Sequence, residues 1–312
     1  MSVKKQVLSV EPIYTGFSSI ATCHYQNLAN ILEAQGLADA RRKICLSWGF
    51  GWREEAVPGI LYGGNRWADV SSQAFSLQLK KMVFDSWETA SAYEDEVIAA
   101  GVPYVVEVDA FVLPSPYHDK EHVVHTVTVL NKEDGSVTIL DNTNNPAPAR
   151  YTLDHYKEMR SHPCEGREDP FVLYVSLPAN PVNAVTNTAM QALLHAVERH
   201  WDQDVVVLDA FMEWAGSNTE PINVCRVAGE REYLQLLFQW FSEDHPNLAP
   251  IAQEFGDLAD RWYLLHMMTA NETTVHTAKR ARNLRLLQEL RQREHAFKDK
   301  VCEALRQELG QS

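Results

Sequence analysis

The chain has 312 residues, of which 45% are hydrophobic, and its formal net charge is −14 at pH 7. This length suits about two domains with a sizeable core, and the acidic balance argues against nucleic acid as a partner, since a phosphate-binding surface needs an excess of Lys and Arg. No apolar run approaches the ~18 residues of a membrane helix, and the first residues lack the apolar block of a signal peptide. We therefore expect a cytoplasmic protein that binds neither nucleic acid nor membrane.

Five cysteines are spread along the chain, at positions 23, 45, 164, 225 and 302. An odd number of widely spaced cysteines in a long chain is typical of reduced thiols and not of a disulfide framework. No CxxC pair occurs, which argues against a zinc site built from thiolates.

The first predicted helix covers residues 23–35. Its apolar side chains follow the i, i+3, i+4, i+7 spacing of one buried face; they are Tyr25, Leu28, Ala29 and Leu32. Thr22 is a suitable N-cap and Gly36 a suitable C-terminal cap. Cys23 then falls at the first helical position, where the positive end of the helix dipole favours a thiolate.

Two interpretations of Cys23 follow from this placement. As a nucleophile it would need a base, and His24 is a poor candidate because the next residue of a helix points about 100° away. The alternative is that Cys23 is a small buried side chain, as cysteines often are.

Residues 45–70 are rich in aromatic residues and glycine, with no dinucleotide-binding or P-loop pattern. We interpret this segment as an irregular loop packed over the core, with Trp48, Phe50 and Trp52 as anchors. The alternative is that it forms one wall of a substrate cleft, in which Trp48 is a candidate site residue.

The next patterns predict a helix followed by three strands. The helix covers 86–101, the strands cover 102–113, 122–130 and 136–140, and a glycine-containing turn at 131–135 joins the last two as a hairpin. A helix before consecutive strands indicates an α+β fold, with the helix packed on an antiparallel sheet.

The hairpin gives a candidate base and its orienting partner. If the loop is residues 132–134, His125 lies directly opposite Asp141, and opposed residues have Cβ atoms about 4.5–5.5 Å apart. A loop that differs by one residue pairs His125 with Asn142 instead. A histidine held by an acid or amide, together with Cys23, would complete a nucleophile, base and orienter. The alternative is a core histidine with a satisfied hydrogen bond.

The segment HDKEHVVH, residues 118–125, also suggests a metal site made of His118, His122 and His125. Its spacing matches no zinc motif, and His122 and His125 lie an odd number of residues apart on a strand, so they face opposite sides. We therefore expect no metal and no cofactor.

The character of the sequence changes near 178–186, where two prolines break the pattern. We predict a catalytic domain over 1–180 and a mostly α-helical domain or extension over 181–312. Residues 279–300 carry eight Lys or Arg and three Asp or Glu, a local charge of 8 − 3 = +5. This helix should bury a stripe made of Leu287, Leu290, Phe297 and Val301. Its arginines would then face solvent, either as an ordinary charged surface or as a docking face.

Four segments resemble the N-terminal domain of the butirosin-biosynthesis acyltransferase family. They are CHYQNLANILEAQG, AGVPYVVEVDAFVLPSPY, HDKEHVVHTVTVLN and VTILDN, and the resemblance covers roughly residues 16–176. The family is papain-like and is associated with moving an aminoacyl group from a carrier-protein thioester onto an amine. The resemblance thus implies a papain-like α+β catalytic domain in which Cys23 is the nucleophile, His125 the base and Asp141 the orienter.

The chain departs from that pattern in two places. Papain-like peptidases usually carry a glutamine a few residues before the cysteine as an oxyanion donor, whereas this chain has Ser18, Ser19 and Thr22 there. Backbone N–H groups at the helix start, with Ser19 or Thr22, are the remaining candidates. The family also favours two tyrosines after LP, whereas this chain reads LPSPY, which leaves Tyr117 as a candidate cleft residue.

The resemblance implies two partners, an acyl carrier protein and a small amine. Carrier proteins are usually acidic, so the basic residues Lys279, Arg280, Arg282 and Arg285 are the candidate docking face. Two alternatives stay open: a peptidase, amidase or thioesterase that uses water, and a non-catalytic scaffold that binds a small molecule or a partner helix.

Overall fold

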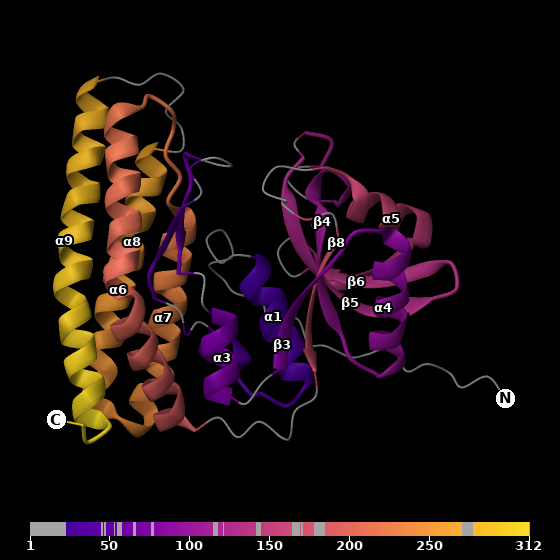
Figure 1. Cartoon of the computed structure of the whole chain (residues 1–312), viewed down its shortest axis with the longest axis horizontal. Coiled ribbons are helices and arrows are strands. Elements are labelled where there is room, and N and C mark those ends of the chain that lie inside the picture. Colours follow the sequence, from indigo (N-terminus) through magenta and orange to yellow (C-terminus); the bar gives the residue numbers. More distant parts are fainter. Residues whose placement is uncertain are drawn as a thin grey trace. The chain divides into compact units, whose positions relative to one another are not determined.

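The computed structural model describes most of the chain as two compact units (Figure 1). The residues it describes are 23–44, 46, 48–52, 54, 58–64, 67–75, 78–114, 118–120, 122–141, 145–163, 169, 171–177, 185–269 and 277–311. The first unit takes its described residues from 23–41 and 78–177, and the second from 42–75 and 185–311. Among these residues, no helix combines the length and the apolar character needed to cross a bilayer.

The first unit is an α+β fold with an antiparallel sheet, as the sequence predicts, and the sheet has six strands where three were predicted. In sheet order its strands are β3 (Gln78–Phe84), β8 (Phe171–Leu177), β4 (Tyr104–Asp109), β5 (Val124–Glu133), β6 (Ser136–Asp141) and β7 (Asn145–Thr152). The helices of the unit are α1 (Cys23–Ala34), α4 (Trp87–Ala99) and α5 (Leu153–Ser161). Helix α1 packs against β5 on one side of the sheet, and α4 and α5 cover the other (Figure 1).

Helix α1 confirms the predicted helix at 23–35 to within one residue. Gly36 ends it with a φ of +94°, a conformation in which glycine is favoured. The N–H of Gly36 donates to the carbonyl of Glu33 (2.9 Å) and that of Leu37 to the carbonyl of Leu32 (3.0 Å), the Schellman pattern. Every residue from Tyr25 to Leu32 is buried, so the helix is enclosed on more than the one face that its spacing predicts.

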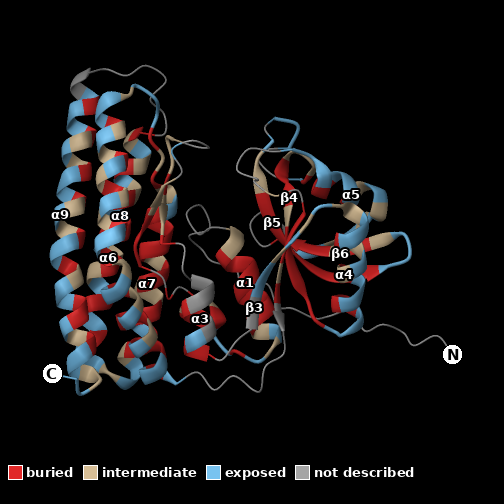
Figure 2. Ribbon diagram, in the orientation of Figure 1, coloured by how far each residue is buried: buried red, intermediate tan, exposed pale blue. Residues whose placement is uncertain are grey.

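Helices α4 and α5 begin at side-chain caps and pack on the sheet through a shared core (Figure 2). Ser86 accepts a hydrogen bond from the N–H of Thr89, which confirms the predicted start of α4, and Thr152 caps α5 in the same way through His155. The predicted strand at 102–113 is shorter in the structure. Its last part turns into a 3-10 helix, Ala110–Val112, because the side chain of Asp109 caps that turn.

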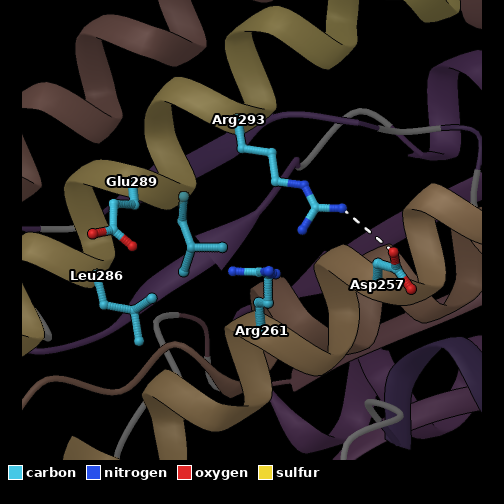
Figure 3. Close-up of a pocket in the computed structure, with 6 residues that line it drawn as sticks. Asp257, Arg261, Leu286, Glu289 and Arg293 are labelled. Atoms are coloured by element: carbon cyan, nitrogen blue, oxygen red, sulfur yellow. Dashed lines mark ion pairs between the residues drawn. The ribbon is translucent and has the colours of Figure 1, made fainter.

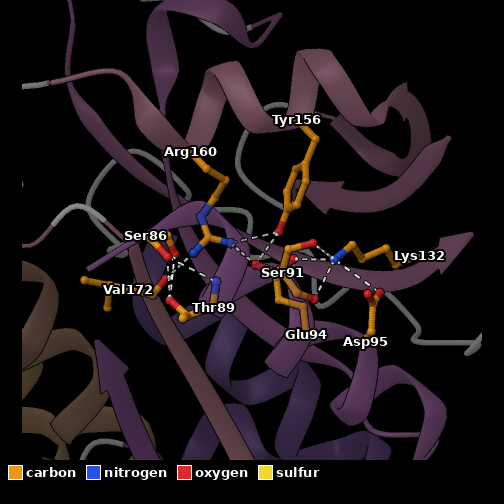
Figure 4. A network of polar contacts seen from close by, with 9 residues as sticks. All are labelled: Ser86, Thr89, Ser91, Glu94, Asp95, Lys132, Tyr156, Arg160 and Val172. Atoms are coloured by element: carbon orange, nitrogen blue, oxygen red, sulfur yellow. Dashed lines mark hydrogen bonds and ion pairs between the residues drawn. The ribbon is translucent and has the colours of Figure 1, made fainter. Parts of the chain in front are cut away.

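A buried polar network ties these helices to the strands (Figure 4). Arg160 of α5 pairs with Glu94 of α4 and donates to the carbonyl of Val172 in β8 (3.2 Å). Lys132 of β5 donates to the carbonyl of Ser91 (2.8 Å) and lies 3.4 Å from Glu94. Buried charges are tolerated in this way only when they are paired and hydrogen-bonded.

The β5–β6 hairpin has a shorter loop than predicted. Glu133 pairs with Ser136, so the loop is the two residues Asp134 and Gly135, and Gly135 has a φ of +79°. Two-residue Asp-Gly loops are favoured because their twist matches that of the strands. A register shift also lies between Val129 and Asn131.

These changes make the predicted direct opposition of His125 and Asp141 wrong. Thr128 pairs with Leu140, and continuing that register puts Asp141 opposite Val127. His125 is then a diagonal neighbour of Asp141, still within reach of a long side chain.

The second unit contains the C-terminal helices. These are α6 (Thr186–Ser217), α7 (Cys225–Asp244), α8 (Ala249–Thr269) and α9 (Thr277–Glu308), with a short 3-10 turn at Pro246–Leu248. The unit also includes β1 (Phe50–Trp52), β2 (Leu61–Gly63) and α3 (Trp67–Phe75), while α2 (Ala40–Lys43) lies where the chain leaves the first unit. The predicted division at 180/181 falls close to the observed one, but the placement of 42–75 in the first domain is corrected.

Aromatic packing and one buried arginine explain this correction. Trp48 is 4% exposed, stacks edge-on with Trp201 and Phe255, and donates from Nε1 to Glu294 of α9 (2.8 Å). Arg231 of α7 pairs with Glu294 (2.8 Å) and donates to the carbonyl of Gly49 (3.1 Å). The segment around Trp48 therefore belongs to the core of the helical unit.

Candidate active site

Cys23 is held at the first residue of α1 by an amide that joins the helix to β5. Nδ2 of Asn27 donates to the carbonyl of Cys23 (2.8 Å) and to the carbonyl of Thr126 (2.8 Å). The hydroxyl of Thr128 in turn donates to Oδ1 of Asn27 (2.8 Å). Because the amide bridges both backbones, the start of the helix is fixed relative to the strand that carries His125.

His125 and Asp141 form a buried pair. Nε2 of His125 lies 2.9 Å from Oδ1 of Asp141, and the two side chains are only 10% and 9% exposed. A hydrogen bond between a histidine and a carboxylate fixes the ring orientation and tautomer. With Nε2 engaged by Asp141, Nδ1 is the ring nitrogen that can serve the thiol of Cys23.

The thiol of Cys23 has an unusually low pKa. Burial of this side chain alone would raise it, but the charge of His125 and hydrogen bonds with His125 and Thr126 outweigh burial and lower the pKa of Cys23 to about 7. Burial likewise acts to lower the pKa of His125, but the charge of Cys23 and the hydrogen bond to Asp141 raise it to about 10. Between these values the favoured form is a thiolate beside an imidazolium.

This arrangement has the three parts of a nucleophilic site. The thiolate of Cys23 can attack an electrophilic carbon, His125 can give or take a proton, and Asp141 can orient the ring. The first backbone N–H groups of a helix have no partner within the helix, so the start of α1 could hold a developing oxyanion.

Six other residues were predicted as candidates for the site or its cleft. Ser18, Ser19, Thr22, Tyr117 and Asn142 lie outside the described residues. Trp48 is corrected: its ring and its N–H are both used inside the helical unit, so it is an anchor, which was the other interpretation of the aromatic loop.

Two site residues were not found from the sequence, Asn27 and Thr126. One signal was available, since Asn27 and Asn30 are amides within an otherwise buried helix. A buried amide normally has a hydrogen-bonding role, but the sequence alone does not show that the partner of Asn27 is β5.

The three histidines at 118–125 do not form one cluster. His118 contacts the carbonyl of Phe111 through Nδ1 (2.8 Å), His122 contacts Asp109 (2.6 Å) and His125 contacts Asp141. The metal site first considered at these three positions is therefore not assembled.

The predicted docking face on α9 needs one correction. Arg280 is only 6% exposed, and its guanidinium donates to the carbonyls of Ala215, Asn218 and Glu220, closing the C-terminal end of α6. Lys279, Arg282 and Arg285 are exposed. The predicted buried stripe of α9 is confirmed by its four members, which are Leu287, Leu290, Phe297 and Val301.

A groove of about 370 Å³ lies between α8 and α9 (Figure 3). Its charged lining is balanced, with two arginines facing two carboxylates, and Arg293 pairs with Asp257 (3.5 Å). Its lining residues are Asp257, Arg261, Leu286, Glu289, Leu290 and Arg293. The groove contains none of the candidate catalytic residues.

Comparison of the sequence with known proteins found no matching family model and no matching curated protein.

Proposed function

We propose that the first unit is a papain-like cysteine acyltransferase domain that moves an acyl or aminoacyl group from a carrier-protein thioester to an amine. The observation that carries the proposal is the arrangement of the half-buried Cys23 with the buried pair His125 and Asp141, in which the thiol stands at the start of α1 and a carboxylate holds the imidazole. The choice of transfer over other thiol chemistry rests on the resemblance of the four segments to the butirosin-biosynthesis acyltransferase family.

The first half-reaction forms an acyl-cysteine. The thiolate of Cys23 attacks the thioester carbonyl, a C–S bond forms, and the carrier thiolate leaves and takes the proton from the His125 imidazolium. The start of α1 stabilises the tetrahedral oxyanion. One thioester replaces another, so this step is close to thermoneutral and leaves His125 neutral.

The second half-reaction transfers the acyl group. A neutral amine attacks the acyl-cysteine, His125 takes the amine proton, and the Cys23 thiolate is expelled as the amide forms. The site returns to the thiolate and imidazolium with which it began. Asp141 contacts neither substrate in this scheme; it holds the ring so that Nδ1 serves the sulfur and the amine in turn.

The experiment that tests this proposal is intact mass spectrometry after incubation with an acyl-loaded carrier protein. We expect wild type and Cys225→Ala to gain the acyl mass and Cys23→Ala to gain none. Adding an amine should discharge the adduct and yield the amide. Discharge at the same rate into free acid with and without amine would identify the water-using hydrolase, and no adduct on any variant would favour the non-catalytic scaffold.

The exposed cations of α9 are the proposed contact for the carrier. Replacing Lys279, Arg282 and Arg285 together by glutamate should weaken carrier binding at low salt and make the remaining binding less sensitive to salt. Arg280 is left unchanged because it is buried against α6. The control replaces Lys298 and Lys300 by glutamate, which reverses two charges at the other end of the same helix. Unchanged affinity in the first variant, or an equal loss in both, would reject this face.

A further inference from the structure

The first unit contains a second cluster of side chains that the proposed acyl transfer does not use. Asp109 ends β4, His122 precedes β5, and His162 directly follows α5. One ligand atom from each residue lies within 4.8 Å of the others. The residues come from three separate places in the chain, and His122 and His162 are 40 positions apart, which is why no sequence motif marks the cluster.

The carboxylate is fixed in place. The side chain of Asp109 is fully buried, and its Oδ1 accepts a hydrogen bond from the N–H of Phe111 (3.0 Å). Its Oδ2 lies 2.6 Å from Nδ1 of His122. One oxygen is therefore held by the backbone, while the other points to the imidazoles. Buried carboxylates are found paired or bound to metals.

The two imidazoles lie at the surface above this carboxylate. The ring of His122 stacks on Phe111 (4.1 Å between centroids) and on His162 (4.8 Å). The side chain of His122 is 42% exposed and His162 is exposed, so ions in solution can reach both rings. The phenyl ring limits His122 to a small range of orientations.

We propose that Asp109, His122 and His162 bind one divalent transition-metal ion, with Zn²⁺ as the best match to two imidazoles and one carboxylate. Three protein ligands and one open position are typical of zinc bound by nitrogen and oxygen. The ion would replace the proton between His122 and Asp109. At about 2.0–2.1 Å from each ligand, a tetrahedral ion sets the N···O distance near 3.3 Å, so His122 moves by less than about 1 Å.

His162 needs the larger adjustment, because stacked rings do not share a coordination plane. Its exposed position just after α5 leaves room for that rotation. The carbonyl end of α5 carries partial negative charge, which favours a cation there. A bound ion would tie the end of α5 to the end of β4.

This cluster lies at the same end of the sheet as the candidate active site, because Val108, next to Asp109, pairs with His125. The thiolate of Cys23 and the imidazole of His125 can also bind Zn²⁺, so Cys23 must be replaced before the number of bound Zn²⁺ ions per chain is measured. The test therefore uses the full chain, free of any histidine tag, with Cys23→Ala as the parent.

Titration calorimetry with Zn²⁺ should give one site per parent chain. His122→Gln and His162→Gln should each weaken Zn²⁺ binding at least about 100-fold, since changes even in outer-shell partners cost 10–100-fold. The control is His118→Gln. His118 also lies between β4 and β5, but it contacts the carbonyl of Phe111, so this variant should bind Zn²⁺ as the parent does. Zn²⁺ should also raise the melting temperature of the parent and of His118→Gln, and not that of His162→Gln.

Two outcomes would overturn the proposal: no heat and no thermal shift in the parent, or equal Zn²⁺ affinity in the parent and His162→Gln. Because both histidines are exposed, neither variant depends on refolding a core. Loss of Zn²⁺ binding here leaves the acyl-cysteine experiment on wild type unaffected, so the two proposals fail independently.

Discussion

Cys23 and Cys225 occupy equivalent positions, the first residue of α1 and the first residue of α7. The pKa of Cys23 is lowered to about 7, whereas burial raises the pKa of Cys225 above its ordinary value. A helix start alone therefore does not make a reactive thiol in this chain. The difference is His125, whose charge and hydrogen bond outweigh the cost of burying the sulfur.

This comparison predicts the pH dependence of thiol alkylation. The thiolate is the nucleophile, so the rate at Cys23 should rise through pH 7 and level off below pH 9, while Cys225 should react only at higher pH. In His125→Ala the sulfur loses the neighbouring cation that stabilises its thiolate, so the pKa of Cys23 should rise and the alkylation rate at pH 7 should fall. Peptide mapping after iodoacetamide treatment measures each site. Equal rates at Cys23 and Cys225 at pH 7 would refute the assignment.

Asn27 and Asn30 are buried amides one turn apart on α1, and only Asn27 joins the helix to β5. Asn27→Ala leaves the carbonyl of Thr126 and the hydroxyl of Thr128 without their amide partner, which should cost about 1–3 kcal/mol of unfolding free energy. Asn30 is equally buried, and its amide makes no hydrogen bond among the described residues. Asn30→Ala removes the same volume, so urea unfolding should show a clearly smaller loss.

Elements whose limits are set by local chemistry were predictable. Gly36 marks the C-terminal end of α1 and Ser86 marks the start of α4, because each residue acts within its own turn of the helix. The register of the β5–β6 hairpin could not be predicted. The choice between a two-residue and a three-residue loop depends on strand twist, and no sequence pattern indicates the register shift near Leu130. His125 and Asp141 still met because diagonal neighbours on a sheet are also within reach.

Strand β2 packs closely on α7, and Gly63 lies at the contact. A Cβ added to Gly63 would overlap the carboxylate of Glu230, which is buried and paired with Arg231 in α7. Gly63→Ala should therefore lower the unfolding free energy by about 1–3 kcal/mol, the usual cost of overpacking. Gly216, in α6, has open space where its Cβ would stand, so Gly216→Ala should be neutral or slightly stabilising. A loss of similar size in both variants would contradict the close packing of β2 on α7.

The division of the whole molecule could be predicted only in part. The boundary near 182 follows a visible change of pattern, but the transfer of residues 42–75 to the helical unit depends on long-range contacts of Trp48 with α6, α8 and α9. An aromatic loop has the same composition whether it lines a cleft or fills a core. Arg280 is a similar case. Its charge predicted an exposed position, whereas its guanidinium binds the carbonyls at the end of α6.

The distribution of probes between the units allows each to be followed in the intact chain. Of the 8 tryptophans, all but Trp87 fall within the second unit, so tryptophan fluorescence reports mainly its unfolding. The reactivity of Cys23 reports the first unit. Denaturant titrations monitored by both signals can therefore separate effects on the two units, whether or not they unfold together.

Fluorescence should reveal an unusual pH dependence in the second unit. Burial, together with the charges of Glu294 and Asp204, holds the pKa of Glu230 well above its ordinary value despite the opposing charge of Arg231. A carboxyl with a raised folded pKa binds its proton more tightly when folded. Ionisation of Glu230 therefore lowers the free energy of unfolding as the pH rises from the pKa of this carboxyl in the unfolded chain, near 4.5, through its pKa in the folded chain. Lowering the pH from 8 toward 5 should raise the denaturant midpoint of the second unit, a trend opposite to that of most acid-sensitive proteins. Glu230→Gln should weaken that trend, and an unchanged slope in this variant would show that another group is responsible.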